Sequence, residues 1–259
     1  MDNKATILLI DDNEEILETV SAELSDLYKI LTAVDGKEGL EILSQEAVQL
    51  VISDIMMPVM DGYELCRQIK SNFNYSHIPV ILLTAKNTLK SKIQGLEQGA
   101  DAYIEKPFDI EYLLVQVANL LANRSKLRNY FTQSPLTHIK SIAHSKSDER
   151  FLEQLKTEIF SRLGNEDLEI EHLAATFNMS RTTFFRKIKA LSGLTPVEFI
   201  NLTRLKKAAE LLAEDEYKIF EIAFMVGFGS QTSFGRSFTR QFGITPSEFQ
   251  KRKREEIGL

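Results

Sequence analysis

The sequence predicts a doubly wound α/β domain followed by an all-helical domain. Three observations support this prediction. Short apolar runs alternate with helical patterns in the first half, a polar stretch follows, and a helical pattern occurs twice in the second half. At 259 residues, with 43% hydrophobic and 26% charged residues, the chain is long enough for two domains that each bury a core.

Five apolar runs in the first half have the length and composition of buried strands. They are Thr6–Ile10, Lys29–Ala33, Leu50–Ser53, Ile78–Leu83 and Ala102–Ile104. Helical patterns follow them over residues 14–27, from Gly36 to about 44, around 65–69, over 90–98 and from 109 to about 130; the first has Ile16, Val20, Leu24 and Leu27 at helical spacing. This alternation predicts a five-stranded parallel sheet of the flavodoxin-like type with right-handed crossovers.

Polar residues stand where four of these runs end. Asp11 and Asp12 follow the first run, Asp54 the third, Thr84 the fourth and Lys106 the fifth. Taken alone, Asp12 or Asn13 can cap the helix that begins near Glu14, Thr84 can be another helix cap, and Lys106 can be a solvated loop lysine. Because the carboxyl ends of parallel strands share the edge where α/β sheets bind ligands, their joint occurrence predicts one site for phosphoryl and cation chemistry.

Five short motifs around these positions carry a resemblance to a known family. They are Leu9-Ile10-Asp11-Asp12, Ser53-Asp54-Ile55-Met56-Met57-Pro58, Asp61-Gly62, Leu83-Thr84-Ala85 and Lys106-Pro107-Phe108. On these motifs, residues 4–122 resemble a bacterial response-regulator receiver domain. The resemblance implies that a histidine kinase passes a phosphoryl group to this domain.

The same resemblance implies the acceptor and the metal ligands. Asp54 corresponds to the carboxylate that accepts the phosphoryl group. Asp11, Asp12, Asp54 and the backbone carbonyl of Met56 correspond to the ligands of a Mg²⁺ ion. Oxygen ligands are what this hard cation requires.

Three further positions correspond to residues that respond to the phosphoryl group. Lys106 would pair with its oxygens and Thr84 would donate a hydrogen bond to them, which neutralises the charge spread over the transferred group. Tyr103 corresponds to the aromatic residue that turns inward as Thr84 moves. A partly exposed strand aromatic is the alternative interpretation of Tyr103.

Charge and cysteine content restrict the setting of the protein. The formal net charge of -6 divides into -8 over residues 1–131 and +2 over residues 132–259. This small excess of positive charge is compatible with nucleic-acid binding but is not evidence for it. Cys66 is the only cysteine, which excludes an internal disulfide and suits a reducing compartment.

The sequence also lacks signals for a membrane. No apolar run approaches the ~18 residues of a membrane span, and the first four residues lack the apolar core of a signal peptide. We therefore expect a cytoplasmic chain that makes no direct membrane contact. A membrane-bound part could still precede it if the chain derives from a longer protein.

A polar stretch separates the two halves. Residues 132–147 are rich in Ser, Thr, His and Gln, and together with the end of the preceding helix they predict a helical extension and linker over residues 123–147. His138 and His144 are six residues apart, and neither cysteines nor acidic residues cluster with them. We expect neither a metal site nor a phosphorelay histidine here.

The second half begins with a helix that Asp148 can cap and that runs to about Leu163, where Gly164-Asn165 ends it. An internal repeat with an offset of 50 residues follows. Its identities include Ser180/Ser230, Phe184/Phe234, Arg186/Arg236, Gly193/Gly243, Thr195/Thr245, Pro196/Pro246, Glu198/Glu248 and Phe199/Phe249. So many identities over twenty positions indicate two copies of one structural unit.

Each copy predicts a short helix, a tight turn and a second helix. The predicted helices cover residues 170–177 and 181–191 in the first copy and 219–226 and 231–242 in the second. Such pairs are helix-turn-helix motifs, whose second helix can lie in the major groove of DNA. The helix predicted between the copies, over residues 196–213, has a length of about 27 Å and would hold them about one DNA turn apart.

Helical spacing divides each second helix into an inward and an outward face. Phe184, Ile188, Phe234 and Phe238 are predicted to point into the core. The outward positions are Arg181, Thr182, Phe185, Arg186 and Lys189 in the first copy and Gln231, Thr232, Gly235 and Arg236 in the second.

Residues 148–254 resemble the AraC/XylS family of transcription regulators, most clearly in Ile222–Phe228 and Phe242–Pro246. The resemblance implies that these outward residues, Gly235 excepted, contact double-stranded DNA. Phe185 departs from the polar residues often found at its position, and it can touch thymine methyl groups or cover the core. Lys251-Arg252-Lys253-Arg254 can contact phosphates or form a solvated tail.

Together the two resemblances imply a two-component response regulator. Phosphorylation of Asp54 would control sequence-specific DNA binding and transcription. We expect a homodimer when the protein is phosphorylated, with RNA polymerase as a possible further partner, and no enzymatic activity beyond self-phosphorylation from the kinase.

Three alternatives remain. The chain can be the C-terminal portion of a membrane hybrid sensor kinase, in which a receiver and an AraC-type domain have this order. A phosphatase that uses Asp54 as nucleophile lacks the second carboxylate two residues later. A ligand-gated AraC-type regulator would need a sugar-binding half in place of residues 1–131.

Overall fold

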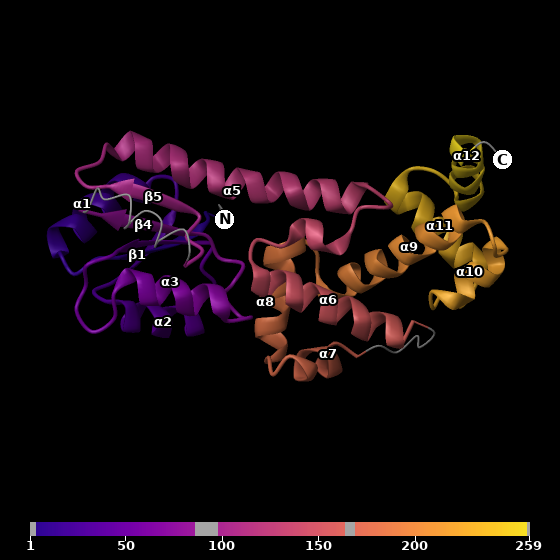
Figure 1. Ribbon diagram of the computed structural model, residues 1–259, viewed down its shortest axis with the longest axis horizontal. Coiled ribbons are helices and arrows are strands. Elements are labelled where there is room, and N and C mark those ends of the chain that lie inside the picture. Colours follow the sequence, from indigo (N-terminus) through magenta and orange to yellow (C-terminus); the bar gives the residue numbers. More distant parts are fainter. Residues whose placement is uncertain (1–3, 86–97, 164–168, 258–259) are drawn as a thin grey trace. The chain divides into compact units, whose positions relative to one another are not determined.

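The computed structural model describes residues 4–85, 98–163 and 169–257 (Figure 1). The chain divides into two compact units, which are described separately below. The first comprises Met1–Arg124 with His144–Asp148, and the second comprises Ser125–Ala143 with Glu149–Leu259. Among the described residues, no helix is both long and apolar enough to cross a membrane.

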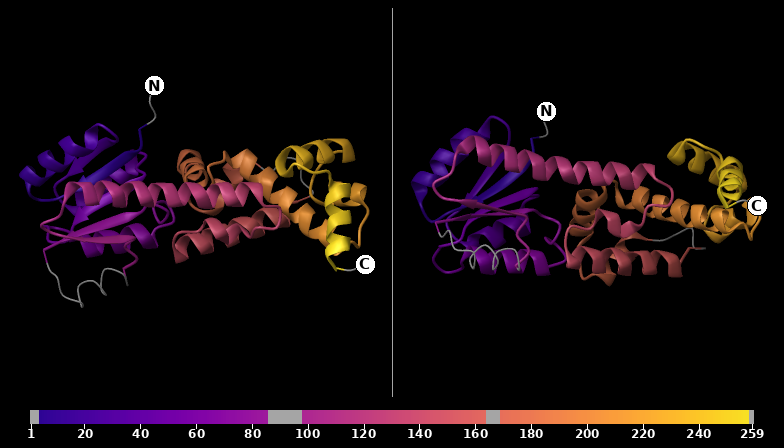
Figure 2. Two further views of the ribbon diagram at one scale, coloured as in Figure 1. Left: turned by 90° about the horizontal axis from the view of Figure 1, so that it is seen from above. Right: turned by 45° about the horizontal axis from the view of Figure 1, so that its top comes forward.

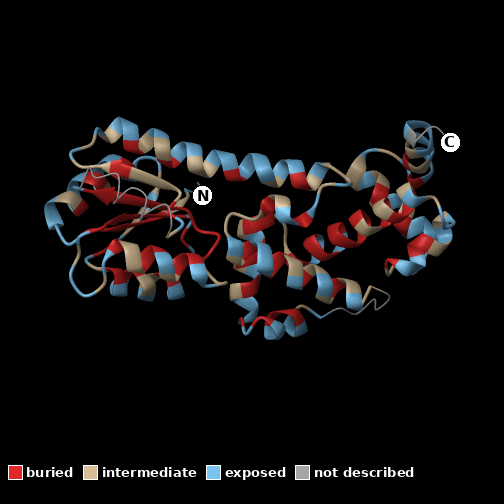
Figure 3. Cartoon of the chain, viewed as in Figure 1, coloured by how far each residue is buried: buried red, intermediate tan, exposed pale blue. Residues whose placement is uncertain are grey.

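The first unit contains a five-stranded parallel sheet. Its strands are β1 (Thr6–Ile10), β2 (Lys29–Ala33), β3 (Leu50–Asp54), β4 (Val80–Thr84) and β5 (Ala102–Glu105), in the order β2-β1-β3-β4-β5. Every residue of β3 and β4 is buried (Figure 3). A strand that is buried on both faces of a sheet has a continuous apolar sequence, which is why these strands could be predicted from the sequence. The fold class predicted for the first half is confirmed.

Helices cover both faces of this sheet (Figure 2). One face packs against α1 (Glu14–Ser25) and the first part of α5 (Ile110–Gln133), and the other against α2 (Gly36–Gln45) and α3 (Gly62–Ser71). The helix predicted over residues 90–98 lies, except for its last residue, outside the described residues.

Two details of the first unit concern single side chains. Leu27, which has helical spacing with Val20 and Leu24 in the sequence, lies beyond the end of α1 at Ser25 and is 58% exposed, whereas Leu17 is buried. Cys66 is buried in the core, and this burial raises the pKa of its thiol to about 11.

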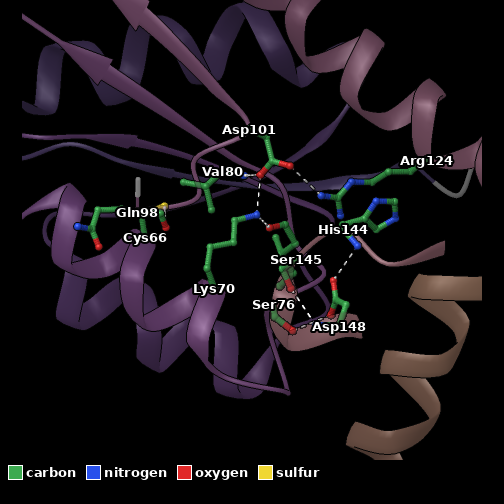
Figure 4. Close-up of polar contacts among 11 residues, drawn as sticks. Cys66, Lys70, Ser76, Val80, Gln98, Asp101, Arg124, His144, Ser145 and Asp148 are labelled. Atoms are coloured by element: carbon green, nitrogen blue, oxygen red, sulfur yellow. Dashed lines mark hydrogen bonds and ion pairs between the residues drawn. The ribbon is translucent and has the colours of Figure 1, made fainter. Parts of the chain in front are cut away.

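Partly buried polar contacts join α3 and α5 to the residues at the amino ends of β4 and β5 (Figure 4). Asp101 accepts hydrogen bonds from the ammonium of Lys70 (2.6 Å), the guanidinium of Arg124 (3.2 Å) and the N–H of Val80 (2.9 Å). Lys70 also donates to the carbonyl of Ile78 (2.8 Å). Burial raises the pKa of the Asp101 carboxyl, but the two cations outweigh it and the pKa lies below its usual value.

Asp148 does not cap the helix that follows the linker. Helix α6 (Lys146–Ser161) begins two residues earlier, and the Ser145 hydroxyl accepts the Asp148 N–H (3.0 Å) in the manner of an N-cap. The fully buried Asp148 carboxylate instead accepts hydrogen bonds from the Ser76 hydroxyl (2.7 Å) and the His144 N–H (3.2 Å) (Figure 4). A partner 72 residues away therefore replaces the local one that the sequence suggested.

The second unit is all-helical over its described residues, as predicted. After the short 3-10 helix η1 (Ile139–Ile142) and most of α6, it contains α7 (Ile170–Thr176), α8 (Arg181–Ser192), α9 (Pro196–Glu214), α10 (Ile219–Met225), α11 (Gln231–Phe242) and α12 (Pro246–Ile257). The predicted helix stop at Gly164-Asn165 lies outside the described residues.

The internal repeat produces the same helix boundaries twice. Ser180 and Ser230 are N-caps, each accepting the N–H of the residue three positions later. Gly193 and Gly243 end α8 and α11 in the left-handed conformation, with φ of 76° and 74°. This conformation favours glycine, so the two helices stop at equivalent positions.

A second pair of caps starts the helices that follow. The Thr195 N–H donates to the Glu198 carboxylate (2.8 Å), and the Glu198 N–H donates to the Thr195 hydroxyl (3.3 Å). Thr245 and Glu248 make the same two bonds at 2.9 and 3.2 Å. These bonds lower the pKa of both glutamates, and they explain four of the repeated residues by local folding alone.

The last turn of α5 belongs to the second unit. Phe131 is fully buried and stacks on Phe199 of α9 with the ring centroids 6.1 Å apart. The Lys206 ammonium lies 4.6 Å from the centroid of the Phe131 ring and donates to the Ser134 carbonyl (2.5 Å). Part of the segment predicted as extension and linker is therefore packed against α9.

Lys206 provides a test of this packing through its titration. Burial lowers the pKa of its ammonium to about 8, with Glu210 opposing the shift. The unfolded chain keeps this proton to a higher pH than the folded chain does, so deprotonation with rising pH favours the folded state. Between pH 8 and about 10, we expect the free energy of unfolding to rise by up to ~3 kcal/mol relative to Lys206→Met.

Urea denaturation at a series of pH values measures this difference. Lys207→Met is the matched control, because the Lys207 ammonium is partly exposed and pairs with Glu210 (3.1 Å). Equal pH dependence of wild type, Lys206→Met and Lys207→Met would contradict the lowered pKa.

Candidate functional site

Four strand ends deliver the predicted site residues to one edge of the sheet. Asp11 follows β1 directly, Asp54 and Thr84 are the last residues of β3 and β4, and Lys106 follows β5. Asp11, Asp54 and Thr84 are 1%, 6% and 2% exposed. Parallel pairing aligns these carboxyl ends, so the apolar runs before them determine where the polar side chains meet.

Lys106 joins the two buried carboxylates. Its ammonium lies 2.6 Å from Oδ2 of Asp11 and 2.5 Å from Oδ1 of Asp54. The second oxygen of Asp54 accepts the N–H of Met56 (2.5 Å), and the second oxygen of Asp11 accepts the N–H of Asn13 (3.0 Å). Both carboxylates are therefore held in place by a cation and by the main chain of the loop that follows each of them.

The charges at this edge do not balance. Burial raises the pKa of the Asp54 carboxyl, Lys106 lowers it, and the nearby charge of Asp11 raises it again, so that it lies above its usual value. Burial lowers the pKa of Lys106, but its bonds to Asp11 and Asp54 outweigh burial and raise it. Two carboxylates thus share one ammonium, and an added positive charge would stabilise the site.

This donor set fits a magnesium ion. Mg²⁺ takes oxygen ligands, uses one or two carboxylates and keeps several waters. The mutual repulsion of Asp11 and Asp54 is what such an ion would relieve. Within the described ranges, no three His, Cys, Asp or Glu side chains lie close enough to form a metal cluster, and Asp12 is exposed. Asp12 and the Met56 carbonyl stay predicted ligands.

The main chain around Thr84 and Lys106 is also connected. The Lys106 N–H donates to the Thr84 carbonyl (2.7 Å), which continues the pairing of β4 with β5 beyond the last strand residue. The peptide bond between Lys106 and Pro107 is cis. The predicted roles of Thr84 and Lys106 toward a phosphoryl group are compatible with this placement and stay predictions.

The loop after Asp54 turns back against its own strand. Gly62, the first residue of α3, donates its N–H to the Ile55 carbonyl (3.0 Å). A Cβ at Gly62 would lie 2.2 Å from the Asp54 carbonyl oxygen and 2.9 Å from the Ile55 Cα. Only a residue without a side chain fits here, so Gly62 sets the distance between α3 and the end of β3.

A contact that the sequence analysis did not identify involves Tyr103. Its hydroxyl lies 2.7 Å from the hydroxyl of Tyr63, the second residue of α3, and both rings are partly buried. The sequence around Tyr63 predicts only that it lies on the apolar face of a helix. Nothing in this local sequence indicates a partner 40 residues away.

The second unit presents the two predicted helix-turn-helix motifs. In α8, Phe184 and Ile188 are only 1% and 0% exposed. In α11, Phe234 and Phe238 are fully buried. The predicted outward residues lie on the opposite faces, Gly235 and Arg186 partly buried and the others exposed, including Phe185 at 43%. The inward and outward assignment is therefore confirmed, while contact with DNA stays a prediction.

The repeated residues separate into those that fold the motif and those that do not. Serine, glycine, threonine, proline and glutamate form helix ends, and the repeated phenylalanines are buried. Arg186 and Arg236 are not buried, and neither makes a hydrogen bond or ion pair with another described residue. Thr182 and Thr232 are also identical and exposed on the same face. Folding does not explain these four residues, which favours a binding role.

Other basic candidates are already engaged. Arg181 pairs with Glu171 of α7 (3.1 Å), although both side chains are largely exposed. Lys251–Arg254 lie within α12 and do not form a frayed tail, and Arg254 binds Asp215 with two bonds of 2.6 Å. This engagement weakens the case for phosphate contacts by the last helix.

Family models match both units. Residues 7–118 match the response regulator receiver domain, and residues 173–252 match a helix-turn-helix domain. The probable transcriptional regulator ycf27 of Galdieria sulphuraria is 33% identical over 226 residues, which cover 81% of this chain and 85% of that protein.

Histidine kinase P4 of Formosa agariphila is 38% identical over 254 residues, which cover 98% of this chain but 18% of that protein. The chain spans about half the length of the ycf27 regulator of Cyanophora paradoxa, at 41% identity over 120 residues. Among solved structures, the BeF3-activated DrrB receiver domain is similar, with 38% identity, a TM-score of 0.43, and coverage of 46% of this chain and 98% of that one.

The close approach at Gly62 gives a stability prediction. Gly62→Ala places a methyl group against the main chain of Asp54, and we expect it to lower the free energy of unfolding by about 1–3 kcal/mol despite the better helix propensity of alanine. Urea denaturation followed by circular dichroism measures the change.

Gly235→Ala is the matched control, because an added Cβ on this residue of α11 meets no atom within 4 Å. It should be neutral or raise the free energy of unfolding by about 0.5–1 kcal/mol. If Gly62→Ala were as stable as Gly235→Ala, the close packing of α3 on Asp54 would be contradicted.

Proposed function

The chain belongs to the response regulators, with a receiver domain followed by an AraC-type helix-turn-helix domain, and we propose that phosphorylation of Asp54 controls its binding to DNA. Receiver and DNA-binding domains in one chain indicate a regulator of transcription. The observation that carries the proposed control is the contact of Asp54 with Lys106 in a buried site that carries excess negative charge.

In the proposed reaction, a carboxylate oxygen of Asp54 attacks the phosphorus of a phosphohistidine on a partner kinase. The new O–P bond replaces the P–N bond, and the histidine nitrogen leaves. Lys106 is close enough to pair with the arriving phosphoryl oxygens, and the Thr84 hydroxyl would donate a hydrogen bond to them.

Asp11, Asp12, Asp54 and the Met56 carbonyl would hold a Mg²⁺ ion in this site. The ion would neutralise charge on the transferred group, which is the main requirement of phosphoryl transfer. Asp11 meanwhile holds Lys106 next to Asp54 through its own bond to the ammonium. We propose no catalytic turnover beyond this self-phosphorylation.

The response would pass from Thr84 and Tyr103 to the surface of the receiver domain and favour a homodimer. Arg181, Thr182, Phe185, Arg186 and Lys189 of α8 and Gln231, Thr232 and Arg236 of α11 would contact double-stranded DNA. A dimer would then present four helix-turn-helix motifs to paired sites, with RNA polymerase as a further partner in the cytoplasm.

A second candidate concerns the origin of the chain. Nearly the whole chain aligns with histidine kinase P4, of which it covers 18%. This alignment supports the alternative that the same two domains are the C-terminal portion of a hybrid sensor kinase. The reading frame upstream of Met1 decides between the two.

Replacement of Asp54 tests the proposed acceptor. Wild-type protein treated with acetyl phosphate and Mg²⁺ should gain the mass of one phosphoryl group, bind DNA more tightly and increase in oligomer size. Asp54→Asn should show none of these changes, because an amide is a poor nucleophile. Intact-mass spectrometry, size-exclusion chromatography and fluorescence anisotropy measure them.

Asp35→Asn is the matched control, since Asp35 is the N-cap of α2 and lies outside the site. It should behave as the wild type does. An equal response of wild type and Asp54→Asn to the phosphodonor would overturn the proposed control.

The unexplained arginines test the DNA interface. Arg186→Ala and Arg236→Ala should each weaken binding to a duplex selected by the wild type from a random library by about tenfold, as expected from the loss of a base or phosphate contact worth about 1–3 kcal/mol. Titrations at several salt concentrations distinguish the two kinds of contact, because loss of a phosphate contact reduces the salt dependence.

Arg162→Ala serves as the charge-matched control. Arg162 directly follows α6 and pairs with Glu158 of that helix at 3.0 Å, outside both motifs. Binding by Arg186→Ala and Arg236→Ala that is as tight as that of Arg162→Ala would exclude these arginines from the interface.

A further inference from the structure

The pairing of the Tyr63 and Tyr103 hydroxyls connects two elements of the receiver domain. Tyr103 lies on β5, opposite Leu82 of β4, and Tyr63 lies in the first turn of α3. Both rings pack against the core cluster formed by the sheet, α2 and α3. Their hydroxyl oxygens are 2.7 Å apart, so one of them donates a hydrogen bond to the other.

The first turn of α3 is also fixed against the acceptor strand. Gly62 precedes Tyr63 directly, donates to the Ile55 carbonyl and lies so close to the Asp54 main chain that no Cβ fits between them. A displacement of the loop after Asp54 would therefore move Tyr63 as well. Because the Tyr63 hydroxyl is hydrogen-bonded to that of Tyr103, the same displacement would change this bond.

We propose that Tyr63 is a positioning residue that holds Tyr103 against α3 until Asp54 is phosphorylated. This inference rests on the proposed function, since it adds a residue that controls the response of the same site. A neutral hydrogen bond is of modest net strength, so the pairing biases Tyr103 between two positions about fivefold and does not lock it.

The hydroxyl of Tyr63, not its ring, carries this inference. A phenylalanine would satisfy the packing of the ring against the core equally well. Tyr75 packs against the same core cluster, so it shows what the loss of a tyrosine hydroxyl does without this pairing. Tyr63→Phe and Tyr75→Phe therefore form a matched pair of variants.

Fluorine NMR of the full chain labelled with 3-fluorotyrosine reports the position of the Tyr103 ring. The Tyr103 resonance is identified by its loss in Tyr103→Phe. In wild type it should shift on treatment with acetyl phosphate and Mg²⁺. In unphosphorylated Tyr63→Phe, the Tyr103 resonance should already lie part of the way toward its position in the phosphorylated protein. This shift corresponds to a change of about fivefold in the ratio of the two Tyr103 positions. Tyr75→Phe should match the wild type.

DNA binding gives a second readout through a double-mutant cycle. At a fixed fraction of phosphorylated protein, Tyr63→Phe and Tyr103→Phe should each change the affinity, and the double variant should change it no further, because both remove the same bond. Each variant keeps its aromatic ring, so loss of folding is not expected to obscure the comparison.

Three outcomes would overturn the inference. An unchanged Tyr103 resonance in Tyr63→Phe would exclude the positioning role while leaving phosphorylation of Asp54 intact. Additive effects in the cycle would show that the two hydroxyls act separately. Absence of phosphoryl uptake by the wild type would overturn the proposed function, and the positioning role with it.

Discussion

Lys106 places one ammonium between the buried carboxylates of Asp11 and Asp54, at 2.6 and 2.5 Å. These residues follow or end β5, β1 and β3, and in the sheet order β4 separates β3 from β5. The long, flexible side chain of Lys106 extends past the end of β4 to reach both carboxylates. The site therefore requires β1, β3, β4 and β5 to be assembled, because its partners come from different strands.

The two ends of the sheet show two carboxylates whose surrounding charges shift the pKa in opposite directions. Asp101 is paired with two cations, Lys70 and Arg124, and its pKa is lowered even though burial raises it. Asp54 shares one cation with Asp11, and its pKa is raised. A pKa shifted by incomplete neutralisation of a buried carboxylate is typical of functional sites. There a bound cation neutralises the remaining negative charge.

The sequence was sufficient where a local pattern fixes the position of a residue, as at a strand end or a repeated helix boundary. Apolar runs located the strands, strand ends located Asp11, Asp54, Thr84 and Lys106, and the repeat located both helix-turn-helix motifs. The helix caps of the repeat are local hydrogen bonds, so their residues could be recognised from spacing alone.

Residues that act through distant partners were missed or misassigned. Asp148 resembles a helix cap, yet its carboxylate binds Ser76, 72 residues earlier. Tyr63 resembles a core residue until β5 brings Tyr103 beside it. Lys206 resembles a surface lysine, but the end of α5 covers it. Such pairs depend on how elements pack, which hydrophobic periodicity does not encode.

The repeat also shows how one fold can present two different outward surfaces. Its shared residues are mostly caps and core, and these hold α8 and α11 in equivalent positions within their motifs. The outward positions differ, with Arg181 and Phe185 in α8 where α11 has Gln231 and Gly235. If both faces bind DNA as proposed, the two motifs would make different contacts, because the phosphate backbone responds to charge and the base edges respond to the particular side chains that reach them.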